Sequence, residues 1–438
     1  MRHKEFRPRT AVRTSFRPAP SRRGPVPRTR HRARGAAAIT AVVLAVIVAA
    51  AIVYGAVQAL RPVPALAMTA SPPPMRTLPG TPPAPAWPAQ GQAAIGMTGA
   101  GLLGAHGGTQ PLPIASLTKI MTAYLVLRDH PLPSGGSGPA ITVSPADVAT
   151  YNTDVGQGES VVKVTAGEKL TELQALEAML IPSGNNIATL LARWDAGSLT
   201  SFVAKMNDAA RSLGLRSTHY ADASGADPAT VSTAADQYSL TLRALQIPAF
   251  RQIVAMPQVT LPVAGTAYNV NAALGHDGIV GVKTGSSQQA GGCLAFAASG
   301  PGAGSQAMIV GVVLGVQPTA RQPSELAGVI AASERLLTSV RAAPEHVEVV
   351  RPGTVLGRVH SAWASGPAAV AATGAGVTGW PGTPVTVAVT PLHLADHVAS
   401  GQTVAHAAVT VGDTVRQIPV IADGAVRPPP LRWRLTRH

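Results

Sequence analysis

The sequence has only one cysteine, Cys293, in 438 residues. A single thiol cannot form an intrachain disulfide, and it excludes a zinc site built from several cysteines. Charged residues make up 13% of the chain and aromatic residues 4%, whereas about 25% of a typical soluble domain is charged. Lysine is scarce as well, with six among the 35 basic residues. We interpret this bias as the codon usage of a GC-rich genome.

The positive charge of the chain is concentrated at its start. The formal net charge is +14, and residues 1–34 contain 12 Lys or Arg against one acid, Glu5, a net charge of +11. The other 404 residues therefore carry a net charge of only +3. Because a nucleic-acid-binding domain carries its basic residues on the folded surface, this distribution argues against nucleic acid as a partner.

A long apolar run follows the basic segment. Residues 35–60 contain no charged side chain, and 26 residues are enough to span a bilayer with some tilt. Since basic residues mark the cytoplasmic side, we expect a disordered cytoplasmic tail over 1–34, a transmembrane helix over 35–60 and an extracytoplasmic remainder. The alternative is a signal peptide that is cleaved near Ala65-Leu66-Ala67, after which the protein would be secreted.

The rest of the chain changes character twice. Residues 62–88 contain ten prolines, which predicts a stiff linker over 61–89. Residues 90–343 show mixed helix and strand periodicity, and residues 344–438 show the alternation and turns of a β-rich domain. The helices are expected over 116–128, 170–180, 186–194, 201–213 and 324–340, and Thr233-Ala-Ala-Asp236 predicts the start of a further helix. The strands of the mixed region are expected over 92–97, 101–106, 279–284, 293–298 and 308–316.

The first chemical motif is Ser116-Leu117-Thr118-Lys119 at the start of an expected helix. Positions i and i+3 share one helix face, so the Ser116 and Lys119 side chains can meet. A serine hydroxyl becomes a good nucleophile when an adjacent base takes its proton. A lysine can be that base if burial or a nearby cation lowers its pKa.

Two further motifs follow in the chain. Ser183-Gly184-Asn185 lies in a loop between two expected helices, and Lys283-Thr284-Gly285 ends an apolar strand. Gly285 has no side chain, so a substrate backbone could approach the strand edge there. A second S-x-x-K, at Ser160–Lys163, lies in a β-branched run that predicts a strand, on which positions i and i+3 face opposite ways. We therefore exclude that copy as the reactive pair.

Three motifs in this order resemble the penicilloyl-serine transferase superfamily. The surrounding sequence is most similar to the D-alanyl-D-alanine carboxypeptidases, the low-molecular-mass penicillin-binding proteins. The similarity covers about residues 90–342 and rests on ASLTKIMTA from Ala115, IPSGNN from Ile181 and DGIVGVKTG from Asp277. It implies an α+β fold in which a transpeptidase/β-lactamase-like domain, an antiparallel sheet flanked by helices with a helical subdomain, is followed by a small all-β domain.

The resemblance also implies a catalytic role for three side chains. Ser116 would attack the carbonyl of the penultimate D-Ala in a peptidoglycan stem peptide, form an acyl-enzyme and release the terminal D-Ala. Lys119 would be the neutral base that activates Ser116, and Ser183 would relay the proton to the leaving amine. β-Lactams would be covalent inhibitors, and no metal or cofactor is implied.

Substrate binding would fall to residues of the second and third motifs. Asn185 would hydrogen-bond the substrate backbone, while Lys283 and Thr284 would bind the terminal carboxylate. The Gly285 backbone would lie alongside the bound substrate. The N–H groups of Ser116 and Ser286 would form the oxyanion hole.

Other functions remain open from the sequence. A DD-endopeptidase would use the same residues. A β-lactamase-like hydrolase is disfavoured because Gly184 replaces the usual Asp of S-D-N and no E-x-x-L-N segment lies between Ser183 and Lys283. A membrane-anchored sensor of cell-wall peptides or β-lactams is a non-enzymatic alternative, although binding alone does not require the base Lys119.

Several other polar residues are given structural interpretations. We expect Asn186 to cap a helix and Cys293 to be a small buried side chain in a strand. His393 and His397 have i, i+4 spacing but no third ligand nearby, so we expect a surface pair.

Overall fold

The computed structural model describes residues 30–73, 77–299 and 307–437, and two antiparallel sheets organise most of them. The first sheet has the strand order β10-β11-β12-β2-β3. The β2–β3 hairpin therefore comes from the start of the mixed region, and the other three strands come from its end. Its strands are β2 (Gln92–Met97), β3 (Gly101–His106), β10 (Ile279–Ser287), β11 (Gly291–Ser299) and β12 (Met308–Val316).

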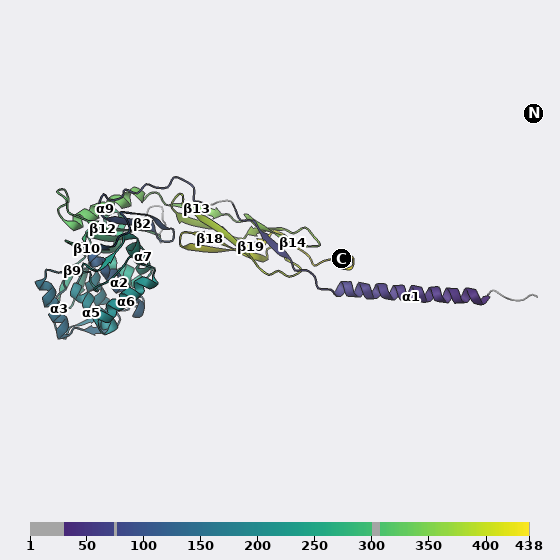
Figure 1. Ribbon diagram of the computed structural model, residues 1–438, viewed down its shortest axis with the longest axis horizontal. Coiled ribbons are helices and arrows are strands. Elements are labelled where there is room, and N and C mark those ends of the chain that lie inside the picture. Colours follow the sequence, from purple (N-terminus) through teal and green to yellow (C-terminus); the bar gives the residue numbers. More distant parts are fainter. Residues whose placement is uncertain (1–29, 74–76, 300–306, 438) are drawn as a thin grey trace, which may run out of the picture. The chain divides into compact units, whose positions relative to one another are not determined.

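Both faces of this sheet are buried. In β2 the side chains of Ala93, Ile95 and Met97 join a hydrophobic cluster with helix α9 (Glu325–Val340), whereas Ala94 joins the cluster of the other helices. This alternation is the two-residue period of a strand. Figure 1 shows α9 on one side of the sheet and the helical lobe on the other.

The helical lobe is formed between β3 and β10. Two of its helices begin with reciprocal capping boxes, Ser144 with Asp147 and Thr171 with Gln174, which satisfy N–H groups that have no partner inside the helix. Its helices are α2 (Thr118–Asp129), α3 (Pro145–Gly156), α4 (Glu172–Leu180), α5 (Asn185–Ala196), α6 (Leu199–Ser212), α7 (Ala234–Ala244) and α8 (Pro248–Val254). Short strand pairs in the same region are β4 (Leu112–Pro113) with β7 (Val231–Ser232), β5 (Ala140–Thr142) with β6 (Lys169–Thr171), and β8 (Gln258–Leu261) with β9 (Gly265–Tyr268).

These elements confirm the helices and strands expected for the mixed region, with shifts of a few residues at their ends. One boundary matters for the chemistry, because the first helix opens with a 3₁₀ turn, η1 (Ala115–Leu117), and α2 itself begins at Thr118. The sequence patterns did not predict α3 and α8.

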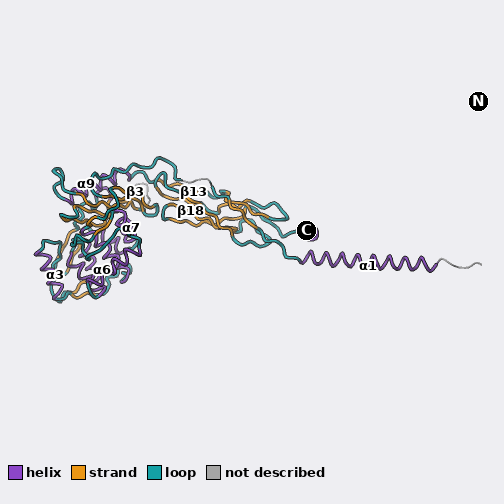
Figure 2. The backbone as a smooth tube through the Cα atoms, in the orientation of Figure 1, coloured by secondary structure: helices purple, strands orange, loops and turns teal. Residues whose placement is uncertain are grey.

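The second sheet is formed mainly by the C-terminal region, where the alternation of residues predicted a β-rich domain. Its strand order is β1-β14-β15-β19-β18-β17, and every neighbouring pair is antiparallel. In Figure 2 these strands are orange and are joined by teal loops. The strands are β1 (Ala67–Ala70), β14 (Val355–His360), β15 (Ala368–Ala371), β17 (Val385–Pro391), β18 (Thr403–Val411) and β19 (Thr414–Ala422), and a separate pair is formed by β13 (Glu345–Val350) and β16 (Ala375–Gly379).

The structure corrects the expected linker over 61–89. Residues Ala67–Ala70 form β1, which pairs with β14, and the Leu66 N–H donates to the Ala395 carbonyl. Leu66 and Met68 are buried in the hydrophobic cluster of the second sheet. This part of the proline-rich segment is therefore a strand of the C-terminal sheet and not a free spacer.

The expected boundary at residue 343 does not separate two independent bodies. Residues 65–427 form one compact unit. Trp380, which lies in the predicted β-rich domain, is 1% exposed and belongs to the cluster that contains Ile95, Phe296 and Leu336 of the mixed region. A large aromatic side chain thus joins the two regions through a shared core.

A second unit consists of the N-terminal helix and the C-terminus. Helix α1 (Arg30–Leu60) begins inside the predicted tail; the rest of that tail, residues 1–29, lies outside the described residues. Among the described helices, α1 alone is long and apolar enough to cross a membrane, over Gly35–Leu60. The predicted all-β end of the chain instead finishes with a short helix, α10 (Leu431–Thr436), after which the Arg437 guanidinium donates to backbone carbonyls near the end of α1.

Candidate active site

Ser116 and Lys119 meet at the start of α2. Ser116 lies in the turn η1 and Lys119 one turn later in α2, and the Lys119 Nζ donates to the Ser116 Oγ at 2.8 Å. Ser116 is partly exposed, whereas Lys119 is completely buried. The arrangement predicted from the S-x-x-K spacing is therefore present, with an accessible hydroxyl beside a buried amine.

The Lys119 amine has two acceptors besides Ser116. Its Nζ donates to the Asn185 Oδ1 at 2.5 Å and to the Ser224 carbonyl at 3.0 Å. Burial lowers the pKa of Lys119 from its ordinary value to about 7, against the opposing attraction of Asp222, Glu159 and Asp154. An amine with this pKa is neutral in a large fraction of molecules near pH 7, so it can accept a proton from the hydroxyl.

The Ser224 carbonyl is held by a loop that the sequence patterns did not indicate. The Asp222 carboxylate accepts hydrogen bonds from the N–H groups of Ser224, Gly225 and Ala226, and also from the Ser224 and Thr230 hydroxyls. A carboxylate that accepts several N–H bonds is a strong local anchor. Since S-G-A-D gives only a loop signal, the contact with Lys119 could be found only in the folded chain.

Ser183 and Asn185 lie where α4 ends and α5 begins, as predicted. Ser183 has a φ of 67°, a conformation unusual for a residue with a side chain, and is 4% exposed. Such backbone strain concentrates at functional sites. Asn185 is the first residue of α5, and its N–H donates to the Ser160 carbonyl at 2.8 Å. Among the described residues, no hydrogen bond joins Ser183 to Ser116 or Lys119.

Strand β10 brings the third motif against the first. A Cβ atom at Gly285 would lie 2.9 Å from the Ser116 nitrogen and 3.2 Å from the Ala115 Cβ. A glycine is therefore required for the strand to approach the turn that carries the nucleophile. Ser286 follows on the same strand and is exposed.

Lys283 and Thr284 are both 2% exposed. Burial, together with the charge of Lys119, holds the pKa of Lys283 well below its ordinary value. The Lys283 Nζ donates to the Thr284 carbonyl at 3.0 Å. The charge of Lys119 thus favours the neutral form of Lys283, as expected for like charges that lie near each other.

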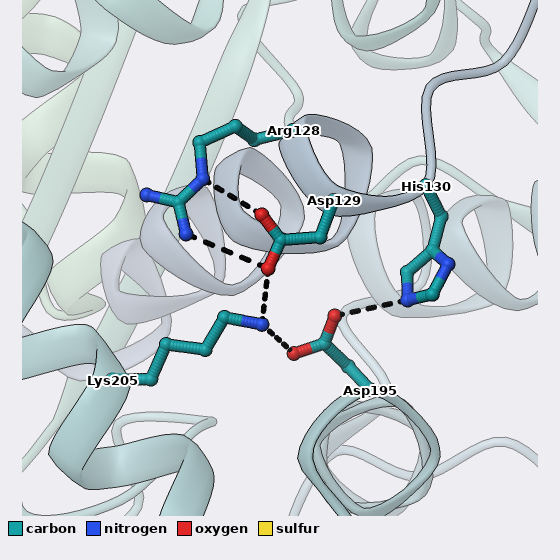
Figure 3. A network of polar contacts seen from close by, with 5 residues as sticks. All are labelled: Arg128, Asp129, His130, Asp195 and Lys205. Carbon is teal, nitrogen blue, oxygen red and sulfur yellow. Dashed lines mark hydrogen bonds and ion pairs between the residues drawn. The ribbon is translucent and has the colours of Figure 1, made fainter.

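A polar network fixes the far end of α2, as Figure 3 shows. The Asp129 carboxylate accepts from the Arg128 Nε at 2.8 Å and also pairs with Lys205 of α6. Lys205 pairs in turn with Asp195 of α5, which also lies 3.2 Å from the His130 Nε2. These contacts tie α2 to α5 and α6, so the helix that bears Lys119 is held by polar contacts at the end opposite the motif.

Comparison with known proteins identifies the family. Residues 81–317, more than half of the chain, match the D-alanyl-D-alanine carboxypeptidase family. A D-alanyl-D-alanine carboxypeptidase of Streptomyces sp. strain K15 is 32% identical over 216 residues, which cover 45% of this chain and 71% of that protein. The chain belongs to the D-alanyl-D-alanine carboxypeptidase family.

Two further relatives extend the comparison. A D-alanyl-D-alanine endopeptidase of Pseudomonas aeruginosa is 32% identical over 190 residues, 42% of this chain and 58% of that protein. The solved structure of penicillin binding protein 5 from Haemophilus influenzae has a TM-score of 0.56 at 20% identity and covers 80% of this chain and 100% of that chain. This likeness supports the α+β fold expected for a member of the D-alanyl-D-alanine carboxypeptidase family, including the region beyond the family match.

The structure corrects the strand that was predicted at the second S-x-x-K, Ser160–Lys163. Residues 160–163 do not form a strand, but Ser160 and Lys163 are exposed and are not the reactive pair. The Asn186 side chain bonds the N–H and the carbonyl of Val162, at 2.9 and 2.8 Å, and therefore does not cap its own helix. Asn186 instead holds the 159–162 segment at the start of α5. The sequence did not predict this interaction.

Cys293 has the buried position predicted for it. It is completely buried in β11, and burial raises the pKa of its thiol to about 12. A thiol with this pKa is unreactive at neutral pH. In the part of the chain that the structure describes, no cluster of His, Cys, Asp and Glu side chains could hold a metal ion, and His393 and His397 are both exposed.

Proposed function

We propose that this protein is a serine-type D-Ala-D-Ala carboxypeptidase that removes the terminal D-Ala from peptidoglycan stem peptides. The observation that carries the proposal is the Lys119 amine, which is buried, bonded to the Ser116 hydroxyl and has a pKa lowered to about 7. This combination suits a base that activates a serine nucleophile.

In the proposed reaction, the Ser116 Oγ attacks the carbonyl of the penultimate D-Ala while Lys119 takes the hydroxyl proton. The Ser183 hydroxyl passes a proton to the leaving amine, D-Ala departs, and water hydrolyses the ester on Ser116. The N–H groups of Ser116 and Ser286 stabilise the oxyanion, each by about 3 kcal/mol. The close approach of β10 at Gly285 to the Ser116 nitrogen supports an oxyanion site formed by these two N–H groups together.

The terminal carboxylate of the substrate is assigned to Lys283 and Thr284. An arriving carboxylate favours the charged form of Lys283 and so offsets the lowering of its pKa by burial. The same charge then acts on Lys119 and favours its neutral form. Asn185, which is 7% exposed, would hydrogen-bond the substrate backbone through its side-chain amide.

A labelled penicillin tests the acyl-enzyme directly. The full-length protein in detergent should take up one covalent label, and Ser116→Ala should take up none. The same protein should release free D-Ala from a diacylated D-Ala-D-Ala peptide. A wild type that neither binds the label nor releases D-Ala would contradict the proposal and favour a non-catalytic sensor.

Endopeptidase activity is the second candidate because one relative is named for it. The two activities differ in the group that follows the cleaved bond. If Lys283 and Thr284 bind a free carboxylate, a C-terminally amidated peptide should be cut much more slowly than the free acid. Equal rates would favour the endopeptidase.

We also propose that α1 anchors the protein in the membrane with the N-terminus in the cytoplasm and the folded region outside. The basic residues before the apolar run support this orientation. Cleavage after Ala67 would divide β1 and remove the buried Leu66, which supports an uncleaved anchor. The protein should fractionate with membranes at its full mass, and a shortened secreted form would contradict the anchor.

A further inference from the structure

Glu159 contacts the site without belonging to any of the three motifs. It lies in the segment between α3 and β6, and its carboxylate accepts a hydrogen bond from the Asn185 Nδ2. The segment is fixed to the start of α5 by the bond from the Asn185 N–H to Ser160 and by the two bonds between Asn186 and Val162. Glu159 is therefore held beside Asn185 by its neighbours in the chain.

The Asn185 amide fits this environment in only one orientation. Its Oδ1 accepts from the Lys119 Nζ at 2.5 Å, and its Nδ2 donates to Glu159. A reversed amide would place two donors face to face at Lys119 and two acceptors face to face at Glu159, since an ionised carboxylate can only accept. Lys119 and Glu159 thus select the same orientation from opposite ends.

The orientation of this amide decides where the Lys119 lone pair points. A neutral amine has two N–H groups and one lone pair, and Lys119 has three polar neighbours: Asn185, Ser224 and Ser116. If the two N–H groups are used by the Asn185 Oδ1 and the Ser224 carbonyl, the lone pair is directed at the Ser116 hydroxyl. That is the geometry a general base needs.

We propose that Glu159 is a positioning residue for acylation, which orients the Asn185 amide and thereby directs the Lys119 lone pair at Ser116. This role rests on the proposed acylation of Ser116 and extends it to a residue outside the motifs. Glu159 does not contact Ser116 in any described hydrogen bond and acts through Asn185.

A second consequence of the same position is electrostatic. The charged groups that act on Lys119 are Asp222, Glu159 and Asp154, which favour its protonated form, and the charge of Lys119 in turn lowers the pKa of Lys283 in β10. Removing the Glu159 charge should lower the pKa of Lys119 further. Because acylation requires the neutral amine, its acidic limb should then move to lower pH.

The test compares three variants of the full-length protein by their rate constants for acylation by a fluorescent penicillin across pH. Glu159→Gln loses the charge but keeps an acceptor oxygen that can face Asn185, so its plateau rate should stay within about threefold of wild type while its acidic limb moves to lower pH. Glu159→Ala loses the acceptor, so its plateau rate should fall by about tenfold, the effect of one hydrogen bond. Glu168→Gln is the matched control, since Glu168 lies in the same segment but bonds the Thr165 N–H and does not act on Lys119; both readouts should match wild type.

Three results would overturn the proposal. A Glu159→Ala plateau rate equal to wild type would show that Glu159 does not orient the Asn185 amide. An unshifted acidic limb in Glu159→Gln would show that the Glu159 charge does not act on Lys119. Normal acylation with a long-lived acyl-enzyme in either variant would assign the carboxylate to the hydrolytic water instead. A wild type that takes no label would overturn the proposed function itself, which keeps the two failures distinct.

Discussion

The pH dependence of acylation is the sharpest consequence of the buried Lys119 amine. Its pKa of about 7 is set mainly by burial, and Asp222, Glu159 and Asp154 keep it from falling further. At this pKa about 9% of molecules have a neutral amine at pH 6, about half at pH 7 and about 90% at pH 8. A solvent-exposed lysine would be neutral in only about one molecule in 3,000 at pH 7.

The acylation rate should therefore rise about tenfold between pH 6 and pH 8 and level off above it. The sign follows from the chemistry, because lowering the pH through the pKa of Lys119 protonates the base and stops the reaction. The measurement is the second-order rate constant for labelling by fluorescent penicillin in single-mixing experiments from pH 5 to pH 9.

The folded state must be followed over the same range. Glu172 is buried at the start of α4, and burial raises its pKa to about 7, so it titrates in the same interval. Circular dichroism and the thermal midpoint at each pH separate loss of the base from loss of structure. A rate that is flat from pH 5 to pH 9, or a limb centred above pH 9 in an intact protein, would refute the assignment of Lys119 as the base.

Three further predictions concern single positions. Lys119→Arg should abolish acylation because a guanidinium stays protonated; labelled-penicillin uptake measures this, and appreciable residual uptake would contradict the base role. Gly285→Ala should slow acylation by roughly tenfold to a hundredfold, because the new Cβ must push β10 away from Ser116 at a cost of about 1–3 kcal/mol. Gly156 has open space around it, so the control variant Gly156→Ala should be labelled at the wild-type rate. Cys293 should resist alkylation at pH 8 in the native protein, because burial raises the pKa of its thiol to about 12; rapid modification followed by mass spectrometry would show that the thiol is accessible.

Local patterns in the sequence were sufficient to predict the strands of the first sheet and the β-rich character of the C-terminal region. The apolar runs that became β10, β11 and β12 and the hairpin β2–β3 could be recognised because strand burial leaves a period of two or a short continuous run. The i, i+3 spacing of Ser116 and Lys119 also predicted their contact, since both lie within one helical turn of each other.

Other features could not be predicted because they depend on contacts between distant segments. The strand Ala67–Ala70 has the composition of a linker and becomes ordered only by pairing with β14. Trp380 likewise shows its role only through the core that it shares with Phe296. No local pattern indicates either partner, since sheet pairing and core packing join residues about 80 to 290 positions apart in the chain.

The same division holds at the site. The sequence by itself determined the chemical groups and their order: a serine with a lysine one turn away, a second serine and an amide where a helix begins, and a lysine within a strand. The tertiary structure alone decided the state of those groups. Burial, Asp222, Glu159 and Asp154 set the pKa of Lys119, and Ser224 and Asn185 accept from its N–H groups. Desolvation and hydrogen bonding depend on which distant segments surround the amine in three dimensions.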